Sequence, residues 1–160
     1  MYDIAQWVSS RIGTVGVGLE HCHVRLYLAV SPTATILIFA LQVPGTAATD
    51  SYLANDEIEI GMGIHGEPGH RRVSPVPPLK KLIPQLLEHL TSTTDPERSF
   101  LPFQGNGSDE VVLLINNLGS TSELELCGVL SEVRGCLTEM GITIQRILCG
   151  TFMVSHSFPP

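Results

Sequence analysis

The order of the apolar segments predicts an α/β fold with a mixed, partly parallel sheet and flanking helices. A continuous apolar run at residues 111–115 precedes a helical stripe between 126 and 140, and a second strand pattern follows at 142–148. Strand, helix and strand in that order imply a parallel crossover. Alternating acidic and apolar residues at 57–62 add a strand with one face in water.

The chain is expected to begin with an amphipathic helix. Apolar residues recur at helical spacing between Ile4 and Ile12, and Asp3 with Gln6 matches a capping-box arrangement. The glycines at 13–18 then predict a turn that leads into a short strand. The first residues lack the basic start and unbroken apolar stretch of a secretory signal, so none is expected.

Residues 25–43 are compositionally unusual, because they hold no acidic residue and one basic residue, Arg25. Their length approaches the ~20 residues that a membrane span needs. Pro32 near the middle and the absence of a basic flank argue against a span. A buried strand pair that turns at Ser31 and Pro32 fits the same residues. A third interpretation, an insertion, depends on the family resemblance described below.

Two helices are expected in the second half of the chain. Apolar residues at helical spacing predict one over 79–90, although Pro84 is expected to break or restart it. A second helix over 126–140 is introduced by capping candidates at 120–122 and ends at Gly141. The apolar run before it is typical of a strand that is buried on both faces.

Composition restricts the class of protein. The chain has 160 residues, of which 43% are hydrophobic and 16% charged, so a single domain with one core is expected. The net charge of −7 disfavours nucleic-acid and anionic-membrane partners. The cysteines form no C-x-x-C pair, which predicts buried free thiols in a reducing, cytoplasmic compartment rather than a disulfide framework. They are Cys22, Cys127, Cys136 and Cys149.

The segment Gly61–Gly69 is the strongest functional motif, because four glycines and a proline surround one imidazole, that of His65. Glycine permits close backbone approaches, so a ligand can sit against the main chain beside this ring. The expected strand at 57–62 ends immediately before the motif. Since ligands in α/β sheets gather at the carboxyl ends of strands, Asn116 and Asn117 are expected at the same edge.

Three segments together resemble the substrate-binding (DhaK-type) domain of dihydroxyacetone (glycerone) kinases. They are Leu53–Gly69 with its Gly-Met-Gly-Ile-His-Gly-Glu-Pro-Gly motif, Val111–Gly119 and Ile12–Leu19. The likeness spans most of residues 3 to 153, and the first motif is highly specific. It implies the second half of that domain, with His65 as the catalytic and substrate-binding residue that holds a ketose through a covalent hemiaminal.

The resemblance also implies partners and cofactors. The expected substrate is a small ketose such as dihydroxyacetone, or glyceraldehyde. The full-length enzyme would use ATP and magnesium on a separate helical domain, or a phosphoprotein partner, and family members are often homodimers. An upstream histidine and aspartate of the family have no counterpart in this sequence, which also has no Walker-type loop. We therefore expect the chain alone to be inactive as a kinase; the alternative is a non-catalytic ketose-binding or partner-binding module.

Two departures from the family pattern suggest a truncated or mis-spliced product, 1–160 being one partial domain. Residues 25–43 separate two halves of a family segment, and removing them restores the family spacing. We therefore interpret them as an apolar insertion that derives from a translated intron. The tail at 154–160 diverges where the family continues into another strand. Such a fragment is expected to expose sheet edges and to aggregate.

The other candidate residues carry weaker patterns. Adjacent residues in an extended segment point to opposite faces, so His21, Cys22 and His23 predict no metal site. The run His70-Arg71-Arg72 is interpreted as a solvated turn, with a phosphate clamp as the alternative. Asn116 and Asn117 are expected to satisfy backbone groups rather than bind a ligand. The remaining candidates have little support: Glu67 as an orienting carboxylate, His89 and His156.

Overall fold

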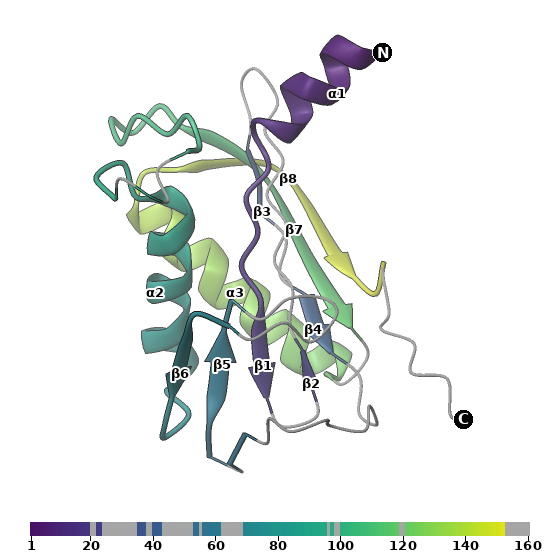
Figure 1. The fold of residues 1–160 in the computed structure, drawn as a ribbon, viewed down its shortest axis with the longest axis vertical. Helices are drawn as coiled ribbons and strands as arrows, with labels where there is room; N and C mark the ends of the chain where they lie inside the picture. Colours follow the sequence, from purple (N-terminus) through teal and green to yellow (C-terminus); the bar gives the residue numbers. More distant parts are fainter. Residues whose placement is uncertain are drawn as a thin grey trace.

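The computed structural model describes residues 1–19, 22–23, 35–37, 40–42, 53–54, 56–61, 69–95, 97, 100–118 and 121–152. Three helices and eight strands lie within these residues (Figure 1). In chain order they are α1 (Tyr2–Ser9), β1 (Val17–Leu19), β2 (Cys22–His23), β3 (Thr35–Leu37), β4 (Ala40–Gln42), β5 (Ile58–Ile60), β6 (Arg71–Val73), α2 (Leu79–Thr91), β7 (Glu110–Leu118), α3 (Glu123–Glu139) and β8 (Thr143–Gly150). The predicted α/β class is confirmed.

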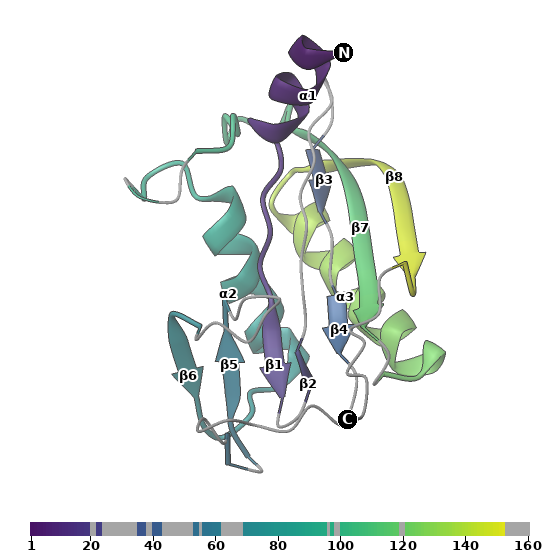
Figure 2. The same ribbon diagram turned by 45° about the vertical axis from the view of Figure 1, so that its right-hand side comes forward.

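The strands form two sheets rather than one (Figure 2). In the first, the strand order is β2-β1-β5-β6 and every pairing is antiparallel. In the second, β7 is central and pairs in parallel with β3 and β4 on one side and with β8 on the other. The expected crossover is therefore present as β7-α3-β8.

The strands β3 and β4 lie along one side of β7 in a single register. Thr35 faces Val111, and Ala40 faces Asn116, so the two short strands continue the same line. The described residues of the 25–43 segment, 35–37 and 40–42, are thus strands of the parallel sheet. The proposed turn at Ser31 and Pro32 lies outside the described residues. Within the described part of the chain, no helix combines the length and the apolar character that a membrane span requires.

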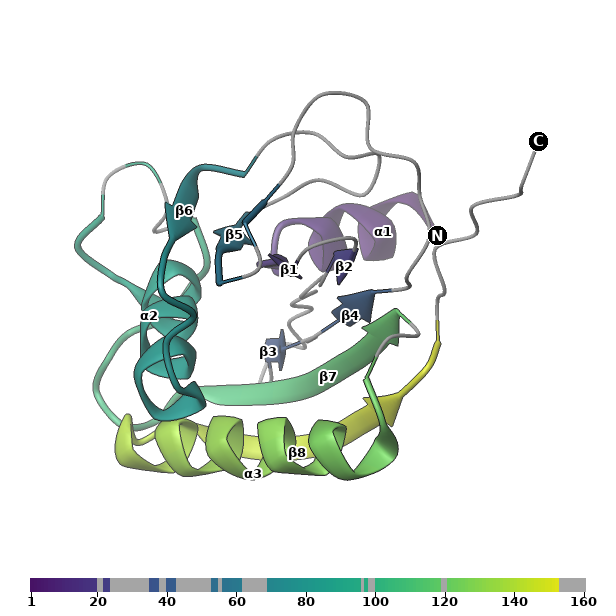
Figure 3. The same cartoon turned by 90° about the horizontal axis from the view of Figure 1, so that it is seen from below.

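Two helices cover the sheets and share one core with them. Figure 3 shows α3 running along β7 and β8, with α2 beside them. The buried faces of both helices meet buried residues of β5 and β7 in one continuous hydrophobic cluster. Its most deeply buried side chains are Ile58, Ile60, Ile83, Leu86, Leu87, Leu113, Ile115, Leu126 and Leu137. From Val111 to Ile115 buried residues alternate with half-buried ones, so the expected burial of both faces is only partly met there.

The helices depart from the prediction in two places. Pro84 lies inside α2, which runs without interruption from Leu79 to Thr91. Pro84 is exposed and cannot donate to the Lys80 carbonyl, but the opposite face of the helix packs in the core and keeps the helix intact. The capping box predicted at Asp3 is also wrong, because α1 begins at Tyr2 and has no side-chain cap bond. None of the α1 residues is buried.

Candidate functional site

The two flanks of the histidine motif are held close together at the end of β5. The backbone N–H of Gly61 donates to the carbonyl of Gly16 at 2.6 Å. The N–H of His70 donates to the carbonyl of Ile60 at 3.0 Å. The chain therefore leaves β5 and rejoins the sheet at the same place. Residues 62–68, which include His65 and Glu67, lie outside the described residues.

Glycine is required at both flanks for reasons of geometry. Gly61 has a φ of 83°, a left-handed conformation that other residues rarely adopt, and a Cβ there would collide with the His70 ring. At Gly69 a Cβ would collide with the carbonyl oxygen of Ile60 and would come within 2.7 Å of the Glu59 Cγ atom. The two ends of the motif thus allow no side chain, as its composition suggested.

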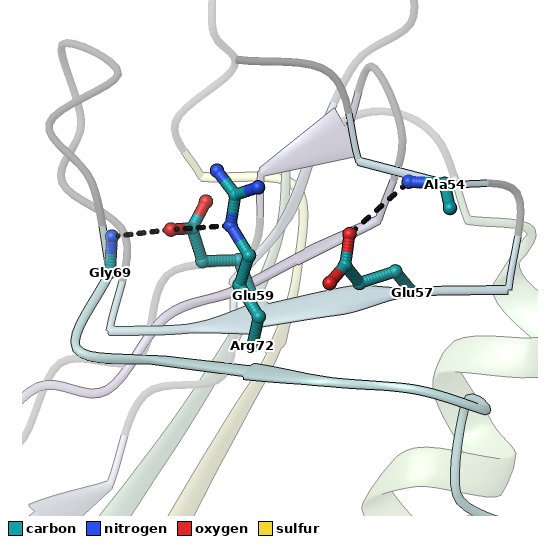
Figure 4. Close-up of polar contacts among 5 residues, drawn as sticks. All are labelled: Ala54, Glu57, Glu59, Gly69 and Arg72. Carbon is teal, nitrogen blue, oxygen red and sulfur yellow. Dashed lines mark hydrogen bonds and ion pairs between the residues drawn. The ribbon is translucent and has the colours of Figure 1, made fainter.

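Glu59 is the main correction to the sequence analysis at this site. The alternating pattern predicted that Glu59 faces water, but the residue is 4% exposed. Its Oε1 atom accepts from the Gly69 N–H at 3.0 Å and lies 3.5 Å from the Arg72 Nε (Figure 4). Opposite it on β1 lies Gly18, which has no side chain to compete for the space. The buried carboxylate is therefore paired with a backbone donor and a cation.

The residues after the motif form a strand instead of the expected solvated turn. Arg71 and Arg72 are exposed members of β6, and Arg72 pairs with Glu59. The ring of His70 meets the ring of His89 edge to face, with 4.9 Å between the centroids. This contact connects the residue just after the motif to α2, and no sequence pattern had singled out His89.

The two asparagines at the end of β7 are used structurally, as expected. Asn117 is 3% exposed, and its side chain donates to the Thr121 carbonyl at 2.5 Å and accepts from the Thr121 N–H at 3.3 Å. Asn116 is 2% exposed and accepts from the Phe152 N–H at 2.7 Å. Both amides thus hold the chain that follows a strand end.

The asparagines and the histidine motif follow strands of different sheets. Asn116 and Asn117 end a strand of the parallel sheet, whereas the motif follows β5 of the antiparallel sheet. The arrows of β5 and β7 point in opposite directions in Figure 1. The assumption of a single sheet was therefore wrong. Whether His65 lies near the asparagines stays a prediction, because residues 62–68 lie outside the described residues.

The cysteines differ in exposure more than the sequence predicted. Cys136 is buried, Cys149 is half-buried and Cys127 is exposed, and all three are free thiols. Burial raises the pKa of the Cys136 and Cys149 thiols, which keeps them protonated and unreactive. No three His, Cys, Asp or Glu side chains of the described residues converge on a metal position. The side chains of His21, Cys22 and His23 lie outside that set.

Comparison with known families gives one strong match. The model of the Dak1 domain family matches residues 27–158 of this chain. Among curated proteins, a dihydroxyacetone kinase of Komagataella pastoris is 50% identical over 108 residues, which are 67% of this chain and 17% of that protein. A dihydroxyacetone kinase of Pichia angusta is 35% identical over 99% of this chain and 24% of its own length.

Further relatives and structures agree with this match. Human triokinase/FMN cyclase is 35% identical over 95% of this chain and 26% of its own length. The chain thus spans about a quarter or less of the curated relatives that it matches. A solved structure titled dihydroxyacetone kinase operon co-activator Dha-DhaQ has the same fold, with a TM-score of 0.60 at 22% identity over 96% of this chain and 39% of that one.

Proposed function

Because this chain belongs to the Dak1 domain family, we propose that it holds a small ketose or aldehyde, such as dihydroxyacetone or glyceraldehyde, through a covalent bond to His65. One observation carries the proposal: the family match covers the histidine motif, and the described flanks of that motif are fixed at the end of β5. Phosphoryl transfer to the bound ketose belongs to the complete enzyme, with ATP and magnesium.

The proposed bond is a hemiaminal. The lone pair of a neutral imidazole nitrogen of His65 attacks the carbonyl carbon, and the C=O π electrons move to the oxygen. The oxygen takes up a proton while the other ring nitrogen releases one, so the net reaction is an addition. The covalent link orients a substrate that offers few other groups for binding. Glycerol has no carbonyl and is expected to be rejected.

Intact mass spectrometry tests this proposal directly. After incubation with dihydroxyacetone, the protein is expected to gain the mass of one ketose, and peptide mapping is expected to place it on His65. His65→Ala should abolish the gain, whereas His156→Ala, a histidine of the 154–160 tail far from the motif in sequence, should preserve it. The same incubation with glycerol is expected to give no adduct. An adduct that survives His65→Ala would refute the assignment.

A second arm of the same experiment addresses phosphoryl transfer. Since that step needs nucleotide, metal and acceptor positioned together, adding ATP and magnesium to the 160-residue chain is expected to yield no ketose phosphate. The phosphorylated product is measured by a coupled assay or by mass. Its formation would show that this chain contains the whole kinase site.

A further inference from the structure

Glu59 is a buried acid whose contacts lie at the base of the histidine motif. Removing a carboxylate from water is costly unless hydrogen bonds and a counter-charge replace the lost hydration. Here the compensation comes from the Gly69 N–H at 3.0 Å and the Arg72 Nε at 3.5 Å. Gly69 closes the motif and Arg72 follows it, so the carboxylate connects the strand before the motif to the chain at and after its end.

The contact with Gly69 belongs to a set of three backbone anchors. The amides of Gly69 and His70 are consecutive, and they donate to the Glu59 carboxylate and to the Ile60 carbonyl respectively. The Gly61 amide donates to Gly16 on the entering side. Of the three acceptors, the Glu59 carboxylate alone belongs to a side chain, so it is the one that substitution can remove without altering the backbone.

Glu57 provides a natural comparison within the same segment. It lies two residues earlier, is half-buried, and accepts from the Ala54 N–H at 3.3 Å (Figure 4). Its contact holds the approach to β5 and does not involve the chain after the motif. Two glutamates of the same pattern therefore have different tasks: Glu57 holds the chain before β5, and Glu59, within β5, holds the chain at the end of the motif.

We propose that Glu59 is a positioning residue for the carbonyl-binding histidine. By holding the Gly69 amide, it fixes where the chain rejoins the sheet after His65, and so the placement of the imidazole relative to the ketose. This inference rests on the proposed function. The alternative is that Glu59 serves the fold alone, as the partner of Arg72.

Two conservative substitutions separate these roles. Glu59→Gln keeps an oxygen at the distance of the Gly69 N–H and removes the charge opposite Arg72. Glu59→Asp keeps the charge and withdraws the carboxylate by one methylene. A positioning role requires a side chain long enough to bring an oxygen to the Gly69 N–H, and it does not require the charge. Glu59→Gln is therefore expected to form the dihydroxyacetone adduct nearly as well as the unsubstituted protein. Glu59→Asp is expected to need a ketose concentration about 10-fold to 100-fold higher, as for a catalytic group misplaced by about 1 Å.

The test is a titration of each variant with dihydroxyacetone, read by intact mass under conditions where circular dichroism shows a folded protein. Glu57→Asp is the matched control and is expected to titrate like the unsubstituted protein. Hydrogen exchange at the Gly69 amide is expected to be faster in Glu59→Asp than in Glu59→Gln. Equal titration of the two Glu59 variants, or weaker adduct formation by Glu59→Gln, would overturn the inference. Absence of an adduct in the unsubstituted protein would instead refute the proposed function.

Discussion

Asn117 illustrates how single buried polar groups shape this molecule. Its amide is 3% exposed and is bonded at both its nitrogen and its oxygen to the backbone of Thr121. These two bonds replace water for the side chain and also close the connection between β7 and α3. The chain can therefore leave a buried strand and start a helix within a few residues.

Truncation of this side chain is expected to destabilise the fold. Asn117→Ala leaves the Thr121 N–H and carbonyl without this partner. Because Thr121 is half-buried, the cost is expected near the lower end of the about 1–3 kcal/mol that an unsatisfied buried group costs. Urea denaturation followed by circular dichroism measures the change in the free energy of unfolding. Asn106→Ala is the control, because its side chain is exposed and makes local bonds to Gln104 and Ser108. An equal loss for both variants would contradict the argument.

At the scale of the residue, the sequence predicted the asparagines and the glycines better than the acids and thiols. The roles of Asn117 and Gly61 depend on local geometry, which a local pattern contains. Glu59 was predicted to face water from the alternation of acidic and apolar residues. Such an alternation does not reveal which other part of the chain covers each face of the strand. Its burial depends on Gly69 and Arg72, which are 10 and 13 residues away. His65 itself stays a prediction.

Helix α3 shows how local chemistry sets an element's boundary. The Ser122 side chain accepts from the Glu125 N–H, and the Glu125 carboxylate accepts from the Ser122 N–H at 2.9 Å and from its hydroxyl at 2.7 Å. This capping box satisfies donors that the first helical turn leaves without partners. Gly141, with a φ of 74°, follows the other end of the helix. Both boundaries were predictable because each uses residues of characteristic type.

The capping box is expected to contribute stability that depends on pH. Hydrogen bonds from the Ser122 side chain and backbone lower the pKa of the Glu125 carboxyl below its usual value of 4.5. Because the folded-state pKa is the lower one, this contribution is present above about pH 4.5 and is lost as the pH falls through the folded-state pKa. Loss of an N-cap serine costs about 1 kcal/mol of stability. Because the Glu125 carboxylate takes part in this cap, Ser122→Ala is expected to destabilise the protein more at pH 7 than at pH 3.

Thermal or urea unfolding of Ser122→Ala at the two pH values measures this difference. Ser131→Ala is the matched control, since Ser131 is exposed in the middle of α3 and alanine favours a helix there. The control is expected to lose no stability at either pH. A cost for Ser122→Ala that stays the same from pH 7 to pH 3 would show that the Glu125 carboxylate takes no part.

Helix α2 marks the limit of propensity arguments at the scale of the element. Proline inside a helix removes one hydrogen bond and crowds the preceding turn, so a break at Pro84 was the local expectation. The buried face of α2 includes Ile83, Leu86 and Leu87, which belong to the common core. Packing of these side chains outweighs the local cost, and such packing depends on residues far away in sequence.

At the scale of the whole molecule, the arrangement of the sheets was the least predictable feature. The β7-α3-β8 unit follows from the order of apolar segments and the handedness of crossovers. The antiparallel sheet instead brings Val17 next to Ile60 and Ile60 next to Arg71, across loops whose sequence shows no hairpin signal. The pairing of β3 and β4 with β7 joins segments that lie even farther apart. Local patterns therefore predicted several of the strands, although not β6, and they did not predict which strands pair.

Strand β8 gives the molecule a surface with the character of an open sheet edge. Among the described residues β8 pairs with β7 alone, so one row of its backbone groups has no strand beside it. Its sequence, Thr-Ile-Gln-Arg-Ile-Leu-Cys-Gly, contains a single charged residue, Arg146. Edge strands with few charges can pair with other chains. We therefore expect the 160-residue chain to associate through β8 as its concentration rises.

A charge at the edge is expected to suppress this association. Ile147 is 36% exposed and lies near the middle of β8, so Ile147→Lys adds a cation that a pairing strand would have to bury. Sedimentation velocity over a range of concentrations is expected to show less self-association than for the unsubstituted chain. Leu124→Lys is the control, because Leu124 is 84% exposed but lies on α3, away from any edge. Since an edge contact requires the backbone of β8, only Ile147→Lys is expected to reduce association. An equal reduction by both substitutions would instead show that exposed apolar surface in general drives association.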